Sequence, residues 1–284
     1  MGEHEIFCCG AVVRIEDGKV RVLSDPMVEY CPLMELLYGV KNITREVVEK
    51  IVKQKIEKYG LFSCCRVFSS SLLVPYGASE IISVCMRKGL LDCAVTVCDG
   101  AGTVISSEPA LVQEIGARLT GIIKTNPVKE TIEYLESRGA IVLDRSTALI
   151  NQPLGLKKAI ELGFRRIATT VTGFTAKWIE DIRALAGEED VGVTVFSVCN
   201  TCVREETLKY LFKADLVWGS ASRIVREKIG PKALLQLGVA IPVYALTSKG
   251  KELILEYLKE FKDKVVIFRS KLPYRAPDKE PQLR

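Results

Sequence analysis

The chain has 284 residues, which is enough for one large α/β domain or two smaller ones. Apolar residues make up 48% and charged residues 26%, a composition typical of a protein that buries a core. Its net charge of +5 comes from Lys and Arg interleaved with Glu along helices, which argues against a clustered nucleic-acid footprint. No apolar run approaches the roughly 18 residues that span a bilayer, and the start MGEHEIFCCG is no signal peptide, so we expect a cytoplasmic protein without membrane contact.

Ten cysteines and a single histidine, His4, limit the chemistry. In a reducing compartment most of these cysteines are thiols, which favours metal binding or redox chemistry over a disulfide scaffold, except in hyperthermophiles. One histidine near a terminus nearly excludes Ser-His-Asp catalysis, Cys-His catalysis and His-rich zinc sites.

The first part of the chain, residues 1–76, is expected to hold a hairpin and a helix. Residues 6–24 read as two strands, IFCCGAVVRI and KVRVL, around an Asp17-Gly18 turn. Apolar residues recur at helical spacing over 43–60, lysines gather toward the end of that segment, and Gly60 is placed as the C-cap.

From about residue 77 the pattern alternates between apolar strands and helices. The strand candidates are 93–98, 140–144, 166–171, 191–198, 215–219, 241–246 and 264–268. Helical segments lie between most of them, and strands apolar on both faces indicate a sheet covered on both sides. We therefore predict a mainly parallel, doubly wound, Rossmann-like sheet over 77–270, followed by an unstructured, Pro-rich tail over 271–284.

Small, polar or sulfur-bearing residues follow several of these strands. In an open parallel sheet, ligands bind beyond the carboxyl ends of the strands, so these residues are candidates for ligand binding. They are Asp99, Gly100, Gly102, Asn200, Gly219, Ser220 and Ser222. The run DGAGTVI has Ile105 where a dinucleotide fingerprint needs glycine, and Gly219-Ser220-Ala221-Ser222 fits either a phosphate site or a helix cap.

The sharpest local signal is Cys199-Asn200-Thr201-Cys202, which lies between a strand and a helix. Helix N–H groups at such a position stabilise a thiolate. A redox dithiol fits less well than half of a zinc or iron–sulfur site, which typically needs four thiolates. Further ligand candidates are Cys98, Cys31 and Cys64, with the adjacent pairs Cys8-Cys9 and Cys64-Cys65.

The remaining cysteines are given structural roles. Cys85 and Cys93 read as small core residues, one in an apolar helix and one on a strand. Cys8 and Cys9 are expected on opposite faces of one strand, so that at least one of them packs in the core. No residue can be assigned a catalytic role from the sequence.

Three collinear segments carry a family resemblance: EYCPLMELLYGVKNIT, GASEIISVCMRKGLLDCAVTVCDGAGTVI and QLGVAIPVYALTSKGKELIL. Together they resemble the archaeal family called methanogenesis marker protein 8, over about residues 6–268. The second segment is also faintly similar to the amino-terminal domain of the β subunit of coenzyme F420-reducing hydrogenase. Some members of the marker family carry a further cysteine at the position of Ala101, so a ligand set built on Cys98 lacks that sulfur here.

The resemblance implies an accessory role in methanogenesis-type anaerobic metabolism. With the cysteines it favours a protein that binds an iron–sulfur cluster or zinc and serves a redox or maturation role, in complex with a partner protein or as a homo-oligomer. Two alternatives remain: a Rossmann-like enzyme that binds a nucleotide or phosphorylated ligand through Asp99, Ser220 and Ser222, and a non-catalytic assembly module. Whether the protein is an enzyme is left open.

Overall fold

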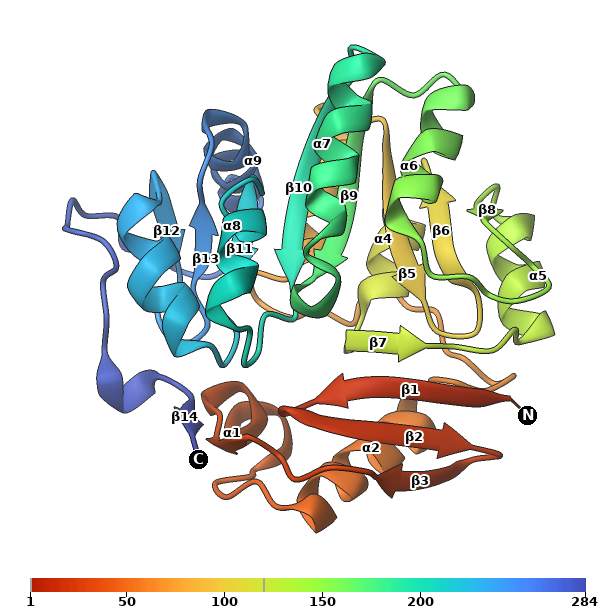
Figure 1. Ribbon diagram of the computed structural model, residues 1–284, viewed down its shortest axis with the longest axis horizontal. Coiled ribbons are helices and arrows are strands. Elements are labelled where there is room, and N and C mark those ends of the chain that lie inside the picture. Colours follow the sequence, from red (N-terminus) through yellow and green to blue (C-terminus); the bar gives the residue numbers. More distant parts are fainter. Residues whose placement is uncertain (1, 120) are drawn as a thin grey trace.

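The computed structural model describes residues 2–119 and 121–284, and Figure 1 shows a large sheet above an N-terminal layer. Over the described residues, the large sheet has the strand order β12-β13-β11-β10-β9-β5-β6-β8. Its strands are β5 (Cys93–Cys98), β6 (Gly102–Ser106), β8 (Ile141–Val142), β9 (Arg166–Thr172), β10 (Gly192–Val198), β11 (Leu216–Trp218), β12 (Leu235–Leu237) and β13 (Val243–Ala245).

This sheet is mixed, which corrects the expectation of a mainly parallel one. The central strands β11, β10, β9 and β5 run parallel to one another. On one side β13 pairs antiparallel with β11 and β12 with β13, and on the other side β6 pairs antiparallel with β5 and β8 with β6. β6 is antiparallel to β5 because the connection between them is short, and a tight turn can join only antiparallel strands. Gly100 and Gly102 provide the positive φ angles of that turn, 76° and 71°.

Helices cover both faces of the large sheet. One face packs against α6 (Gln152–Glu161), α7 (Trp178–Glu188) and α8 (Leu208–Leu211), and the other against α3 (Ala78–Arg87) and α9 (Ser248–Leu258). Near β6, α4 (Pro109–Gly116) and α5 (Lys129–Ser137) bury a smaller apolar cluster. No helix in the described ranges is long and apolar enough to cross a membrane.

The N-terminal layer is an antiparallel sheet with helices packed beneath it. Its strand order is β3-β2-β1-β7, formed by β1 (Glu3–Cys8), β2 (Ala11–Glu16), β3 (Lys19–Val22) and β7 (Gly121–Lys124), with α1 (Pro32–Tyr38) and α2 (Arg45–Tyr59) below. The Asp17-Gly18 turn and the helix over 43–60 are confirmed, the latter capped by Thr44 and by Gly60 at φ 62°. Because β7 pairs with β1, residues from beyond α4 complete this layer.

The segment IFCCGAVVRI is two strands, not one. Cys9 and Gly10 form the turn between β1 and β2, with φ angles of 52° and 81°. The expectation that Cys8 and Cys9 lie on opposite faces of a strand is therefore wrong, because Cys9 leaves the strand and the two sulfur atoms lie 4.0 Å apart.

The end of the chain also differs from expectation. Residues 264–268 form no strand, and Val266 and Ile267 are 83% and 79% exposed. The tail, expected to be unstructured, instead returns to the N-terminal layer, where β14 (Gln282–Leu283) pairs with β4 (Val28–Tyr30). The backbone N–H of Arg284 then donates to the carbonyl of Met27 at 2.9 Å.

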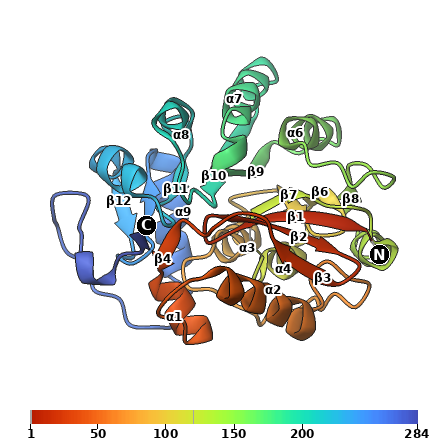
Figure 2. The same ribbon diagram turned by 60° about the horizontal axis from the view of Figure 1, so that its bottom comes forward.

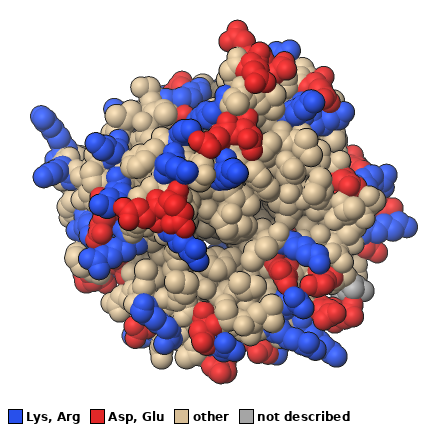
Figure 3. Space-filling view, viewed as in Figure 1, with Lys and Arg blue, Asp and Glu red and all other residues tan. Residues whose placement is uncertain are grey.

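The relative placement of the two layers positions the candidate site. In Figure 1 the arrowheads of β9 and β10 point toward β7 and β1, so the carboxyl ends of these parallel strands face the N-terminal layer. Figure 3 shows a hollow in the middle of this face of the molecule, at the same level, with mostly uncharged walls.

Candidate functional site

The loop after β10 is held by one buried side chain, Asn200. Its amide Nδ2 donates to the carbonyls of Ser197 and Trp218 at 3.0 and 2.9 Å, and its Oδ1 accepts from the Ser197 hydroxyl at 3.0 Å. Its backbone N–H donates to the Ser220 hydroxyl at 3.1 Å. Asn200 thus joins the ends of β10 and β11 and fixes the cysteines on either side of it.

The backbone around these strand ends is strained. Cys199, Cys202 and Ser220 have φ angles of 52°, 57° and 45°, and Cys9 at the end of β1 has 52°. Non-glycine residues in this left-handed region cost of order 1–3 kcal/mol each, and such residues cluster at binding and active sites. Three of them lie in the loops after β10 and β11, which Asn200 joins, and these loops are therefore a candidate site.

Cys199 lies where the two layers meet. A Cβ atom built on Gly121 of β7 would be 3.5 Å from the Cβ of Cys199, 3.1 Å from the ring of Phe174 and 3.6 Å from the Cβ of Phe7. A larger residue than glycine at position 121 would therefore crowd Cys199 and the aromatic rings beside it. Phe174 is 44% exposed, so this junction reaches the surface of the molecule.

Several thiols gather here, and we call Cys8, Cys9, Cys31 and Cys199 the cysteine seam. Burial raises the pKa of Cys199 to about 11, with Lys55 opposing this shift and Cys8 adding to it. Contact with Cys8 and burial raise the pKa of Cys9, and the charge of Cys31 adds to the shift while Lys55 opposes it. Burial likewise raises the pKa of Cys31, which caps α1 and is also affected by Cys8.

Two cations act on the cysteine seam: Arg226 on Cys31, and Lys55 on Cys9 and Cys199. Lys55 lies on α2, is 5% exposed, and its charge acts on Cys9, Cys199 and Tyr38. Within residues 2–119 and 121–284, the geometry gives its ammonium group neither a carboxylate within ion-pair distance nor a hydrogen-bond acceptor. The Lys55 Nζ is not among the fully buried atoms that lack a partner, so the ammonium group reaches solvent while its charge faces the thiols, and this positive charge favours an anionic group bound beside it.

Sequence reasoning missed Lys55, although a signal was present. Val48, Ile51 and Val52 form the buried face of α2, and Lys55 continues that face at the next helical position. A lysine within an apolar stripe is the pattern that could have identified it.

The three cysteines predicted at one rim lie in different environments. Cys98 is fully buried, its sulfur 3.4 Å from the Asp99 carbonyl, and burial followed by the Asp99 charge raises its pKa to about 12. Cys202 is half-buried, its N–H donates to the Ala221 carbonyl at 3.3 Å, and burial alone raises its pKa. The charges that act on Cys199 are instead those of Lys55 and Cys8.

Metal ligation by these cysteines stays a prediction. Among the residues that the structure describes, no group of three or more His, Cys, Asp or Glu side chains is placed to hold a metal ion. None of the ten cysteines, all of which lie within the described residues, forms a disulfide, and Cys64 is exposed on a loop distinct from the cysteine seam.

Asp99, predicted as a ligand-binding residue, forms a buried ion pair. Its Oδ1 accepts from Nε of Arg66 at 2.7 Å, and its Oδ2 accepts from the N–H of Phe62 at 2.6 Å. The neighbouring Gly100 donates its N–H to the Thr125 hydroxyl, and a Cβ on Gly102 would meet the Ala148 carbonyl oxygen at 2.1 Å. Each has a structural role in this position.

The polar groups of the loop Gly219–Ser222 likewise form hydrogen bonds within the protein. The Ser222 hydroxyl accepts from the N–H of Val225 at 3.4 Å, and the N–H of Gly219 donates to the Pro242 carbonyl at 2.7 Å. The buried guanidinium of Arg226 donates to the carbonyls of residues 219, 220, 222 and 240. This loop therefore caps the following helical turn, as its alternative interpretation predicts.

Comparison with known proteins places the chain in a family. Residues 4–259 match the family described as "Uncharacterized protein conserved in archaea (DUF2099)". The chain belongs to this archaeal family. It is also 40% identical over 279 residues to "Uncharacterized protein MJ0054" of Methanocaldococcus jannaschii, with 96% of each chain covered. The range matched to the family includes the whole cysteine seam and Lys55 and ends before the returning tail.

Proposed function

We propose that this protein is an accessory factor of methanogenesis-type anaerobic metabolism that binds an iron–sulfur cluster or a thiophilic metal ion such as zinc at the cysteine seam. The resemblance of three collinear segments to the methanogenesis marker protein 8 family supports the metabolic setting. The role follows from thiol ligands in a partly covered junction: holding a redox centre, or passing it to a partner protein during maturation of another enzyme.

One observation carries this proposal: Lys55 is buried beside thiols without an acidic partner. Centres ligated by three or four thiolates carry net negative charge, whether the metal is zinc or an iron–sulfur cluster. An ammonium group next to such a centre offsets that charge by Coulomb attraction.

The residues that would hold the group are Cys8, Cys9, Cys31 and Cys199. The sulfurs of Cys8 and Cys9, 4.0 Å apart, would subtend an angle of about 120° at an ion about 2.3 Å from each. Cys31 and Cys199 come from the sequence prediction, and the charge of Cys8 acts on both. Since the described residues form no ready three-ligand group, binding in this proposal includes rotation of these side chains.

When bound, an iron–sulfur cluster would supply one-electron transfer, whereas zinc, which has no redox chemistry, would be held as cargo; in either case the protein's own residues would position and shield the group. The strained turns at Cys9 and Cys199 fix where the two sulfurs start, and Phe174 and Phe7 restrict access of water beside Gly121.

Anaerobic purification followed by iron, sulfide and zinc analysis tests the proposal. We expect a bound metal in the native chain, loss of it in Cys199→Ala, and a lower content in Lys55→Met with the fold retained by circular dichroism. Cys93→Ala is the matched control, because Cys93 is fully buried in the sheet core on β5. A metal-free native chain with ten titratable thiols, or equal metal in Cys199→Ala and Cys93→Ala, contradicts the proposal.

An assembly module is the second candidate, favoured by the exposed apolar run 265–268. Val265, Val266, Ile267 and Phe268 are 41%, 83%, 79% and 58% exposed on a segment without strand pairing. If this segment binds a protein partner or a second copy, Val266→Asp with Ile267→Asp changes the mass of the assembly in solution and leaves the metal content unaltered. An unchanged mass together with retained partner binding would exclude this role for the segment.

The Rossmann-like nucleotide-binding enzyme ranks below these two. Its proposed ligand groups on Asp99, Ser220 and Ser222 all accept hydrogen bonds from within the protein. A thermal-shift screen of nucleotides tests the nucleotide-binding hypothesis, and a compound that raised the unfolding temperature would support it.

A further inference from the structure

A second pair of adjacent cysteines, Cys64 and Cys65, lies on the loop that follows α2. Both are exposed, and their sulfur atoms are 3.7 Å apart. This loop lies outside the cysteine seam, and nothing in the proposed function uses it.

The loop is held firmly although its thiols are exposed. On one side of the pair, the N–H of Phe62 donates to Asp99, and on the other side the buried Arg66 forms its ion pair with the same carboxylate. Between these anchors, the Ser63 hydroxyl donates to the Gly60 carbonyl at 2.8 Å and accepts from the N–H of Cys65 at 3.2 Å. The two sulfurs are thus presented to solvent from a fixed backbone.

The separation of the sulfurs suits chelation of one ion. Two sulfurs 3.7 Å apart, each about 2.3 Å from a common ion, subtend an angle of about 107° there, close to the tetrahedral value. Zinc and related soft divalent ions prefer this geometry with thiolate ligands. The spacing already matches two of four tetrahedral positions.

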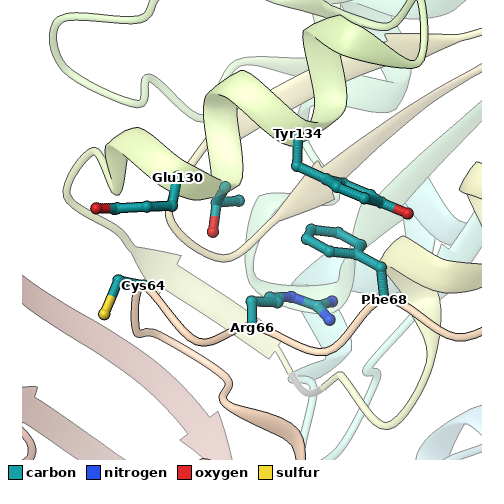
Figure 4. A pocket seen from close by; sticks show the side chains of 6 residues that line it. Cys64, Arg66, Phe68, Glu130 and Tyr134 are labelled. Carbon is teal, nitrogen blue, oxygen red and sulfur yellow. The ribbon is translucent and has the colours of Figure 1, made fainter.

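A small cavity adjoins the pair (Figure 4). Its volume is about 220 Å³, and it is lined by Cys64, Arg66, Phe68, Glu130, Thr131 and Tyr134. Figure 4 shows Cys64 and Glu130 at one end of this cavity, Glu130 from the first turn of α5 and Cys64 from the facing loop. At the other end the Phe68 and Tyr134 rings stack at 4.2 Å, with the Arg66 guanidinium beneath Phe68.

The pair and its surroundings also interact electrostatically. Contact with Cys65 raises the pKa of Cys64, and the Glu130 carboxylate adds to that shift. The same arrangement that disfavours a free thiolate favours a bound cation, because a divalent ion is attracted to both thiolates and to the nearby carboxylate.

We propose that Cys64 and Cys65 form an open surface site for a soft divalent metal ion of the zinc class. The ion binds both sulfurs, and the two thiols release two protons to solvent without any change of oxidation state. No third His, Cys, Asp or Glu ligand completes the set among the described residues, so the other two positions take water or a donor from another molecule. Such a two-thiolate site holds its ion weakly and exchanges it, which suits uptake or hand-over at the surface.

Cadmium titration of the metal-free, reduced full-length chain under anaerobic conditions tests this site. Thiolate-to-cadmium absorbance in the near ultraviolet and proton release measured with an indicator dye report binding. We expect the native chain to bind one more ion, and release two more protons, than a variant with Cys64→Ser and Cys65→Ser. Cys93→Ala, which removes a thiol that is fully buried in the sheet core, is the control and should bind as many ions as the native chain.

Equal binding by the native chain and the double variant would overturn the proposal. To separate this site from the cysteine seam, the titration is repeated in a Cys199→Ala background. The difference of one ion between chains with and without the Cys64-Cys65 pair should persist there, and its disappearance would assign the ion to the seam instead.

Discussion

At the level of single residues, Asp99 connects three parts of the protein. Its carboxylate, 1% exposed, receives Arg66 and the N–H of Phe62 from the loop after α2, while its own backbone begins the turn between β5 and β6. Arg66 also donates to the carbonyl of Ile115 at the end of α4, at 2.9 Å. The loop that carries Cys64 and Cys65 depends on this one ion pair.

We expect Arg66→Met to lower the free energy of unfolding by about 3–5 kcal/mol, because it leaves the Asp99 charge buried without its partner. Urea denaturation monitored by circular dichroism measures this. The control is Arg223→Met, whose ion pair with Glu227 joins an arginine side chain that is 78% exposed, and whose loss should change stability little. Similar effects of both substitutions would show that the buried pair is not important for stability.

The sequence predicted some of the core cysteines but not which residues from distant segments come into contact. Cys85 and Cys93 were predicted as core residues, and both are fully buried, because their neighbours along the chain are apolar at helix or strand spacing. The partners of Asp99 and the thiols on which the charge of Lys55 acts could not be read from the sequence, because they come from distant segments that only tertiary packing brings together. For the same reason, no local pattern links Cys199 to Cys8.

At the level of elements, the βα rhythm correctly predicted an α/β fold and the central strands β5, β9, β10 and β11. It missed β6, whose first residue, Gly102, was interpreted as part of a ligand-binding loop. Closely spaced glycines such as Gly100 and Gly102 occur in tight turns and in phosphate-binding loops alike, so composition alone cannot distinguish the two. Residues 264–268 have strand-like composition, but no neighbouring strand edge pairs with them.

Gly102→Ala should destabilise the β5–β6 hairpin strongly. The new Cβ would lie 2.1 Å from the backbone oxygen of Ala148 at a positive φ of 71°, so both the turn and the loop against it would have to move. Gly139→Ala is the matched control, since Gly139 has φ 78° with no atom within 4 Å of the added Cβ. We expect a loss of about 1 kcal/mol in the control and clearly more in Gly102→Ala, measured by thermal or urea unfolding. Equal losses would mean that the close approach to Ala148 is unimportant.

At the level of the whole molecule, the two layers are connected by two segments from later in the chain, β7 and the tail. β7 joins the N-terminal layer from the middle of the sequence, and the tail after α9 reaches it through β14. On the way, Glu280 pairs with Arg275 at 2.6 Å and lies 3.9 Å from Nε of the buried Arg226. The Pro-rich composition of 271–284 concealed this docking from sequence reasoning, because the contacts that join the tail to the N-terminal layer are with distant residues such as Met27 and Ile43.

Docking of the tail should depend on pH in the acid range. The hydrogen bond from Arg275, with the charges of Arg275 and Arg226, lowers the pKa of Glu280 below its ordinary value near 4.5. The stabilisation is therefore fully present above about pH 4.5 and is lost as the pH falls through the lower, folded-state pKa. Proteolysis or hydrogen exchange of residues 275–284 should increase below about pH 4, and Glu280→Gln should show the increase already at pH 7. Protection of the tail that does not change with pH in the native chain would contradict this.

Pairing of the last residues with a strand near the start has a consequence for biosynthesis. A nascent polypeptide emerges from the ribosome with its amino-terminal end first, and β1 through β3 can form early because their partners are adjacent in sequence. β4, however, waits for β14, which is synthesised only after both layers and all the helices between them. Pairing of β4 is thus a late step of folding, and a bulky group attached at Arg284 would lie against Met27 and Ile43, where it would hinder that step.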